Sequence, residues 1–132
     1  MYDTLKKHFG YDAFRPLQED IIARVLQKED CLVLMPTGGG KSLCFQLPAL
    51  VRNLRLGVLS IVISPLQALM KDQVDNLNRL TESNFAAALY GMLTPPERGD
   101  VLERIRLGDV AILYVSPEQL RNASFRKVIK QR

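Results

Sequence analysis

The chain has 132 residues, 47% hydrophobic and 24% charged, which is the composition of an ordinary soluble globular protein and a length that suits one compact domain. No apolar run approaches the roughly 20 residues that cross a bilayer, and the N-terminal stretch lacks the basic-then-apolar order of a signal peptide. We therefore expect no membrane partner and a cytoplasmic location.

The net charge of +4 would suit a nucleic-acid-binding protein, but its distribution weakens that interpretation. Residues 121–132 hold five of the 18 basic residues and none of the 14 acidic ones. The rest of the chain therefore has 13 basic and 14 acidic residues, so the basic character belongs to an open C-terminal tail. Net charge alone does not identify a partner.

The two cysteines, Cys31 and Cys44, lack the paired spacing of a zinc site, and His8 is the only histidine. A zinc site built from cysteine and histidine is therefore not indicated. We expect two reduced thiols that are both mostly buried, since free cysteine is often a core residue.

A helical pattern comes first in the chain, over residues 15–27. Pro16 stands near its start, and Glu19 and Asp20 lie in its first turn, where acidic side chains complement the helix dipole. The apolar residues of the pattern recur on one face, which predicts a helix that packs against a core. They are Ile21, Ile22, Val25 and Leu26.

Four short apolar runs follow, each succeeded by a turn signal and an amphipathic stretch. Near-continuous apolar runs separated by helical patterns are typical of parallel strands that are covered on both faces. The sequence therefore predicts one doubly wound α/β domain, with a parallel sheet and helices on both of its faces. The expected strands are residues 30–35, 57–64, 85–90 and 110–116.

A glycine-rich segment, MPTGGGKS at residues 35–42, follows the first expected strand and precedes a helical pattern. This context is typical of a P-loop, in which successive amides form an anion site at the positive end of a helix. Gly38, Gly39 and Gly40 would let the backbone approach phosphate oxygens, which a plain glycine-rich turn would not require. Lys41 would place a charge near the β- and γ-phosphates, and the Ser42 hydroxyl could ligate Mg²⁺.

The segment departs from the usual P-loop arrangement in two respects. Met35 stands where the pattern G-x-x-x-x-G-K-S/T begins with glycine, and we interpret it as the last residue of the strand. No expected strand ends in the acid that orients the metal in such sites, because Asp30 and Asp109 precede their strands. The chain is therefore expected to hold half of an ATPase site, which binds a nucleotide without hydrolysing it.

Two expected strands run into the same element, Ser-Pro-x-Gln, at residues 64–67 and 116–119. The element predicts a helix start with an N-cap serine, a proline in the first turn and a glutamine that completes a capping box. Both helix starts would lie at the carboxyl edge of the sheet, where ligands of open α/β sheets bind. Ser64 and Ser116 either only cap helices or also contact the phosphates of a nucleic acid strand, and the two interpretations are compatible.

Taken together, these residues resemble the first RecA-like motor domain of RecQ-type superfamily 2 DNA helicases, over nearly the whole chain. The resemblance rests on four motifs in order, of which each is weak alone and the set is specific. They are FGYDAFRPLQEDII (residues 9–22), MPTGGGKS with the methionine that this family has there, ISPLQALMKDQV (residues 63–74) and ILYVSPEQL (residues 112–120).

The resemblance implies a site for ATP and Mg²⁺ and a path for single-stranded and partly duplex DNA. Gln18 would hydrogen-bond the adenine edge, Arg15 would help to fix that end of the nucleotide, and Tyr11 would stack on it. The phosphates would be held by Thr37, Gly38, Gly39, Gly40, Lys41 and Ser42, with Lys41 as the catalytic lysine and Ser42 as the Mg²⁺ ligand. The DNA strand would be contacted by Ser64, Pro65, Gln73, Ser116 and Pro117.

The resemblance further implies a parent helicase that couples ATP hydrolysis to 3′→5′ unwinding in DNA repair and recombination. Its location would be the bacterial cytoplasm, in association with the nucleoid, or a eukaryotic nucleus. Residues 1–132 would be a truncated N-terminal part of the first RecA-like domain, ending before the DExH motif. Such a piece is expected to be inactive alone and to self-associate through its uncovered sheet edge.

Two other classes of protein stay open. The chain could be a nucleotide- and nucleic-acid-binding P-loop module that never hydrolyses ATP, in which case it would be the complete gene product. It could also be another P-loop enzyme such as a kinase, although we recognise neither an acceptor site nor a lid, and a kinase would leave Gln18 without a role.

Overall fold

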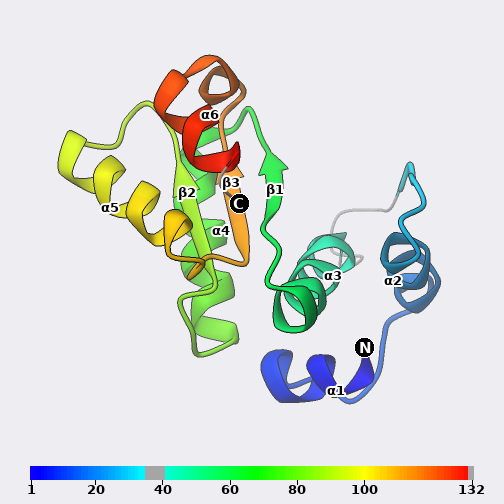
Figure 1. The fold of residues 1–132 in the computed structure, drawn as a ribbon. Coiled ribbons are helices and arrows are strands. Elements are labelled where there is room, and N and C mark those ends of the chain that lie inside the picture. Colours follow the sequence, from blue (N-terminus) through cyan, green and yellow to red (C-terminus); the bar gives the residue numbers. More distant parts are fainter. Residues whose placement is uncertain (35–40, 131–132) are drawn as a thin grey trace. The chain divides into compact units, whose positions relative to one another are not determined.

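The computed structural model describes residues 1–34 and 41–130, and the chain divides into two compact units (Figure 1). The first unit is Met1–Leu56 and the second is Gly57–Arg132. Within the described residues, no helix has both the length and the apolarity that crossing a membrane requires.

The described part of unit 1 is helical. It consists of α1 (Tyr2–Thr4), the π-helix η1 (Leu5–Phe9), α2 (Gln18–Leu26) and α3 (Lys41–Leu56). Helix α2 packs against α3, and the Arg52 guanidinium of α3 donates a hydrogen bond to the Val25 carbonyl in the last turn of α2. That carbonyl also accepts from the Lys28 N–H at 3.0 Å at the end of its own helix, so the guanidinium adds a second bond that joins the two helices. The predicted helix over residues 15–27 is thus present as α2.

The strand predicted over residues 30–35 is wrong for the part that the structure describes. Residues 30–34 form no strand, and Leu32 and Leu34 are 90% and 87% exposed. An apolar run becomes a strand only when a neighbouring strand accepts its backbone hydrogen bonds, and the described part of unit 1 offers none. The expectation for the thiols fails at the same place, because Cys31 is exposed and only Cys44 is buried. Burial raises the pKa of the Cys44 thiol.

Unit 2 is built on a parallel sheet, as predicted. Its strands are β1 (Ser60–Ile63), β2 (Ala86–Leu89) and β3 (Ile112–Val115), in the order β1-β3-β2. Each strand lies within its predicted run and is shorter at both ends. The fold class, a parallel sheet between helices, is confirmed.

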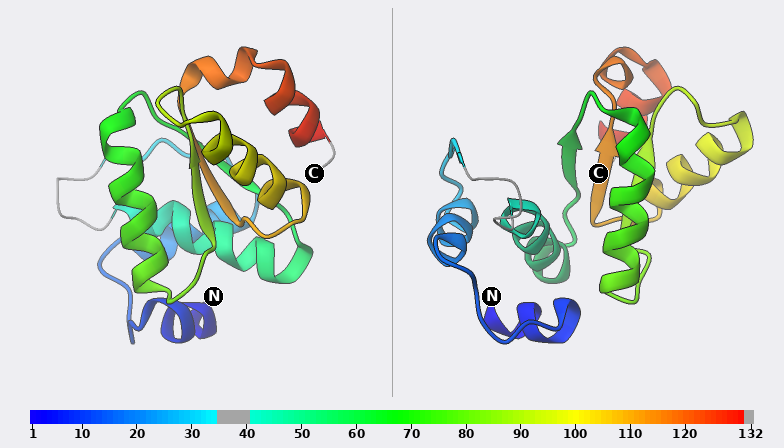
Figure 2. Two further views of the ribbon diagram at one scale, coloured as in Figure 1. Left: turned by 90° about the vertical axis from the view of Figure 1, so that its left-hand side faces the viewer. Right: turned by 180° about the vertical axis from the view of Figure 1, so that it is seen from behind.

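The helices of unit 2 cover both faces of this sheet. Helix α4 (Gln67–Leu80) joins β1 to β2, and α5 (Pro95–Arg106) joins β2 back to β3. The chain crosses the sheet in opposite directions in these two steps, so right-handed crossovers place the two helices on opposite faces. Figure 2 shows α4 and α5 on opposite sides of β2 and β3.

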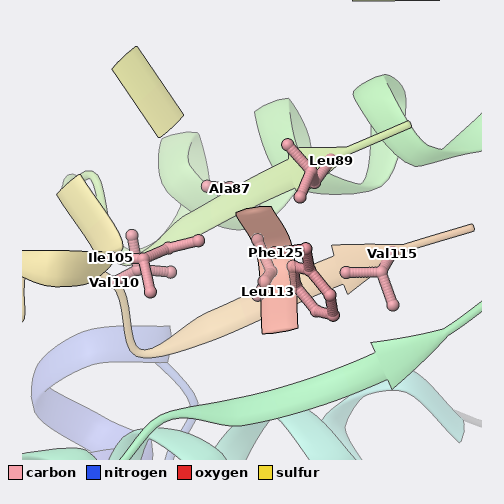
Figure 3. Close-up of a cluster of buried hydrophobic side chains, with 7 residues drawn as sticks. All are labelled: Ala87, Leu89, Ile105, Val110, Leu113, Val115 and Phe125. Carbon is pink, nitrogen blue, oxygen red and sulfur yellow. The ribbon is translucent and has the colours of Figure 1, made fainter. Parts of the chain in front are cut away.

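One hydrophobic cluster lies between the sheet and the helices on the α5 face (Figure 3). Alternate residues of β2 and β3 supply the sheet side, as the two-residue period of a strand requires. Phe125 of helix α6 (Ala123–Lys130) is 2% exposed and closes the cluster. The other members are Ala87, Leu89, Ile105, Val110, Leu113 and Val115.

The prediction of an open basic tail over residues 121–132 is therefore wrong for residues 121–130. Arg121 ends the short 3-10 helix η2 (Pro117–Arg121), and α6 follows. Phe125, Val128 and Ile129 recur at helical spacing, and all three pack on the hydrophobic cluster. The basic residues of this segment therefore lie on a helix that also has an apolar face.

Candidate functional site

The described residues predicted to bind the nucleotide lie in unit 1. Lys41 and Ser42 are the first two residues of α3, and both are exposed. A lysine and a hydroxyl at a helix N-terminus, where the backbone amides favour an anion, are what a P-loop requires. The remaining predicted loop residues lie outside the described residues; they are Met35, Thr37, Gly38, Gly39 and Gly40.

A tight turn holds the predicted adenine-binding residues Arg15 and Gln18. The Gln18 backbone N–H donates to the Arg15 carbonyl at 3.1 Å, and the Gln18 Oε1 atom accepts from the Arg15 backbone N–H at 2.7 Å. Pro16 and Leu17 are the central residues, and Leu17 has φ 70° and ψ −17°. These are the angles of a type II turn, in which proline is common at the first central position and glycine is preferred at the second.

Leucine is an unusual residue in this left-handed conformation, which costs a residue with a Cβ atom about 1–2 kcal/mol. The reciprocal Arg15–Gln18 bonds hold the turn against that cost. Gln18 is buried, and Arg15 and Tyr11 are exposed. The structure thus brings Arg15 and Gln18 together and fixes the glutamine carboxamide.

A cavity of about 780 Å³ lies beside this turn. The Tyr2 and Phe14 rings line it and lie 5.2 Å apart between centroids, and a hydrogen bond to Glu19 is the main cause that raises the pKa of Tyr2. Of the three residues predicted at the adenine end, Arg15 lines the cavity and Tyr11 and Gln18 do not, so the cavity does not join all three. The remaining lining residues are Met1, Ala13, Arg15, Pro16, Leu17, Glu19, Asp20 and Ala23.

The protein donors suit Mg²⁺ held chiefly by a nucleotide. Across residues 1–34 and 41–130, no three or more His, Cys, Asp or Glu side chains are grouped to hold a metal ion. Mg²⁺ usually keeps several waters and takes one or two protein oxygens together with substrate phosphates. A single hydroxyl, that of Ser42, fits this kind of binding.

The predicted nucleic-acid residues lie in unit 2, the two Ser-Pro elements at the carboxyl edge of the sheet and Gln73 within α4. Ile63 and Leu89 both align with Val115 in the strand register. The Ser64 N–H donates to the Val115 carbonyl at 3.0 Å, and the Ser116 N–H donates to the Leu89 carbonyl at 3.3 Å. The structure therefore places the two Ser-Pro elements at one edge, as the sequence predicted.

The capping boxes predicted at these elements are wrong. Helix α4 begins at Gln67 with Leu66 as its N-cap, and the Ser64 Oγ atom accepts from the Leu66 N–H at 3.3 Å. Ser116 is the N-cap of η2 and Pro117 its first residue, but the serine side chain makes no cap hydrogen bond. Ser64 instead closes a local turn of the kind serine often forms, which delays the helix start.

A capping box does occur in unit 2, one element away. Thr94 Oγ1 accepts from the Glu97 N–H at 3.3 Å, and Glu97 Oε1 accepts from the Thr94 N–H at 2.9 Å, at the start of α5. The signal was in the sequence, because Thr-Pro-Pro-Glu matches the capping pattern with proline in the first turn. These bonds are the main cause that lowers the pKa of Glu97.

The two glutamines of the Ser-Pro elements, Gln67 and Gln119, have another role. Gln67 Nε2 donates to Glu118 Oε1 at 2.9 Å, and Arg98 Nη1 donates to Gln119 Oε1 at 2.6 Å. Glu118 and Gln119 are adjacent in η2, so η2 is bonded to the first residue of α4 and to the first turns of α5. Sequence reasoning missed Arg98 and Glu118, since nothing local to them marks a contact 21 or 51 residues away.

The Ser116 hydroxyl lies at the centre of this edge. Ser116 is fully buried, and its Oγ atom makes no hydrogen bond of regular geometry with the described residues. It is nevertheless the main cause that lowers the pKa of the Glu118 carboxyl group, ahead of the Glu118 backbone and Gln67. Pro65 and Pro117, which follow the two serines, are exposed, and so is Gln73 within α4.

Comparison with known families and proteins identifies the family of the chain. Residues 15–131 match the model of the DEAD/DEAH box helicase family. The chain is 43% identical over 129 residues to ATP-dependent DNA helicase RecQ of Synechocystis, covering 98% of this chain and 26% of that protein. It is 44% identical to the RecQ helicase of Pasteurella multocida, covering 96% of this chain and 19% of that protein.

The fold has a counterpart among solved structures. A hypothetical ATP-dependent RNA helicase from Sulfolobus tokodaii superposes with a TM-score of 0.70 at 22% identity, over 98% of this chain and 38% of that one. The chain spans about a quarter of the Synechocystis protein's length, so the relatives carry much that these residues do not. The chain belongs to the DEAD/DEAH box helicase family, in its RecQ-type branch, as the motifs indicated.

Proposed function

We propose that residues 1–132 are the ATP-binding N-terminal part of the first motor domain of an ATP-dependent, RecQ-type DNA helicase. The observation that carries this is the pair of elements in unit 1: the Arg15–Gln18 turn with its fixed carboxamide, and Lys41 and Ser42 at the start of α3. The first suits a nucleobase edge and the second suits phosphates. The relatives at 43% and 44% identity are named ATP-dependent DNA helicases.

In this proposal each residue has a separate task. The Gln18 carboxamide, whose Oε1 atom accepts from the Arg15 N–H, hydrogen-bonds the adenine edge, and Tyr11 stacks on the base. Lys41 stabilises the charge on the β- and γ-phosphates, and Ser42 holds Mg²⁺. Mg²⁺, when bound, neutralises the charge that develops on the phosphates.

The acid that orients metal and water is assigned to a part of the parent outside residues 1–132. Strands β1, β2 and β3 are followed by Ser64, Tyr90 and Ser116, and none of these is acidic. We therefore expect the 132-residue chain to bind ATP without turning it over. The parent would convert hydrolysis into 3′→5′ unwinding, with single-stranded and partly duplex DNA on the carboxyl edge of unit 2.

Nucleotide titration with two variants tests the nucleotide site. Lys41→Ala is expected to weaken ATP binding by about tenfold or more, because a charge-assisted contact to phosphate is lost. Gln18→Glu keeps the oxygen that accepts from Arg15 but loses the amide donor, so preference for ATP over GTP should fall while the turn persists. Equal ATP affinity in wild type and Lys41→Ala would contradict the phosphate site.

A second measurement addresses activity. Residues 1–132 are expected not to hydrolyse ATP whether they are part of a motor or a non-hydrolysing module. DNA-stimulated ATP hydrolysis by this chain that Lys41→Ala abolishes would contradict the assignment of the acid to another part of the parent. Hydrolysis by the parent, lost with the same substitution, would exclude the non-hydrolysing module.

We also propose that the isolated chain self-associates through β1. In the described residues β1 pairs only with β3, and its Ile61 and Ile63 are 39% and 54% exposed. An apolar strand edge is a template for pairing with another chain. Sedimentation should show concentration-dependent dimers, and a monomer at high concentration would exclude this.

A further inference from the structure

Helix α6 carries a basic face that the proposed function does not use. Arg126, Lys127 and Lys130 are exposed along it, and Arg121 is exposed at the end of η2 just before it. The sequence has no acidic residue after Glu118. No ion pair is found for these cations among the described residues, whereas Arg106 pairs with Glu103 and Arg24 with Asp20.

The basic face is held in a fixed position on unit 2. Phe125 anchors α6 in the hydrophobic cluster, and Asn122 Oδ1 caps the helix by accepting from the Phe125 N–H at 3.0 Å. Arg126 Nε donates to the Leu120 carbonyl at 2.7 Å, which ties α6 back to η2. Through Gln119 and Arg98, η2 is itself fixed to α5. These cations therefore sit on a rigid support and not on a solvated tail.

The basic face of α6 follows the predicted DNA contacts at the carboxyl edge closely in the chain. Strand β3 leads through Ser116 directly into η2 and then α6, so the cations begin five residues after the serine at the predicted DNA contact. In Figure 1, α6 starts beyond the arrowhead of β3 and runs back along the sheet. A nucleic acid strand that touched the exposed Pro117 would lie four residues along the chain from Arg121, the first of these cations.

We propose that Arg121, Lys127 and Lys130 form a phosphate-binding surface that extends the DNA path of unit 2 beyond the Ser-Pro elements. This rests on the proposed function, because it takes DNA at the carboxyl edge as its starting point. The eight residues of α6 are about 12 Å long, which spans about two to four phosphates of a strand. The contact is to the backbone and is independent of base sequence.

The test is DNA binding by the 132-residue chain, measured by fluorescence anisotropy with a labelled oligo-dT strand at several salt concentrations. The triple variant Arg121→Gln, Lys127→Gln, Lys130→Gln is expected to bind about tenfold or more weaker at low salt. The slope of log affinity against log salt should fall by about 2, since each lost phosphate contact removes about 0.7 for a single strand. Arg126 is kept because it bonds to Leu120.

The matched control is the triple variant Lys28→Gln, Arg55→Gln, Arg79→Gln, which removes the same charge from exposed positions outside η2 and α6. It should keep most of the affinity and slope. Circular dichroism of all variants checks that the helices are retained, as expected for exposed side chains. Equal losses in the two triples would overturn the proposal, because general charge would then explain them.

Failure of the proposal and failure of the proposed function give different results. If the wild type binds DNA, Gln73→Glu weakens it and the α6 triple does not, the DNA site stands and the α6 surface is excluded. If the wild type binds no DNA even at low salt, the DNA site at the carboxyl edge and its extension are both excluded. Selective loss in the α6 triple supports both.

Discussion

The two units of this chain hold their functional residues in different ways. In unit 2 the strand register fixes the positions of Ser64 and Ser116, and a hydrophobic cluster of its own lies under them. In unit 1 the described residues form no strand, and Arg15 and Gln18 depend on one turn with a leucine in a left-handed conformation. A sheet therefore supports the predicted nucleic-acid site, and local backbone contacts support the predicted nucleotide site.

The difference teaches which features a short chain can specify by itself. The Arg15–Gln18 turn is closed by bonds between residues three apart, so it does not depend on strand pairing. The apolar run at residues 30–34 needs a strand beside it, and it stays exposed. Neighbouring residues are enough to specify caps and turns, whereas a strand also requires a second strand to which it can hydrogen-bond.

The largest effect on stability is expected for Phe125→Ala, which tests whether the two units unfold separately. Removing a buried aromatic ring from the cluster of unit 2 should lower the free energy of unfolding by about 3–5 kcal/mol. Hydrogen exchange would then show faster opening of β2 and β3, while the amides of α2 keep their protection. The measurement combines urea denaturation with amide exchange by NMR.

The control for this variant is Leu120→Ala, which removes a side chain that is 41% exposed and should change stability little. Loss of protection in α2 to the same extent as in β3 would show that the two units unfold together. The two units would then not be supported independently of each other.

An intermediate effect is expected at the bonds of η2. Gln119 is buried, and Gln119→Ala leaves the Arg98 guanidinium without its partner, so we expect a loss of about 1–3 kcal/mol. Gln67→Ala removes an exposed bond to Glu118 and should cost less than about 1 kcal/mol. Thermal denaturation of both variants measures the difference, and a larger loss in Gln67→Ala would contradict the assignment of Arg98–Gln119 as the stronger contact.

The smallest effect is expected in unit 1, at Leu17. Leu17→Gly removes a left-handed strain of about 1–2 kcal/mol and adds an entropy cost of about 0.5–1 kcal/mol, so the net change is a stabilisation of about 0.5 kcal/mol. Leu17→Ala is the control, because it shortens the side chain and keeps the strain. The change is measured from the protection of the α2 amides against hydrogen exchange at increasing urea concentration. Equal stability of the glycine and alanine variants would show that the turn is not strained.

Much of unit 2 could be predicted from sequence. The runs that contain Ile61, Ala87 and Leu113 are strands, and the helices between them cover both faces, because apolar runs and helical periods are properties of the sequence alone. The prediction at residues 121–130 was wrong because a basic composition does not exclude an apolar face at helical spacing. Phe125, Val128 and Ile129 were the signal that identifies α6.

The candidate sites could be predicted only in part. The carboxyl-edge position of Ser64 and Ser116 follows from strand direction, and it is confirmed. The capping boxes were wrong because Ser64 closes its own turn, and no sequence pattern distinguishes that turn from a cap. The bonds of Glu118 and Gln119 join residues far apart in sequence, so they required the fold.

The two bonds of η2 also bear on how this segment would behave under tension. Glu118 and Gln119 reach in different directions, one to α4 and the other to α5, which lie on opposite faces of the sheet. A force applied to η2 would therefore be transmitted to helices on both faces of the sheet and not to a single loop. Two neighbouring side chains of η2 thus connect the helices on both faces of the sheet.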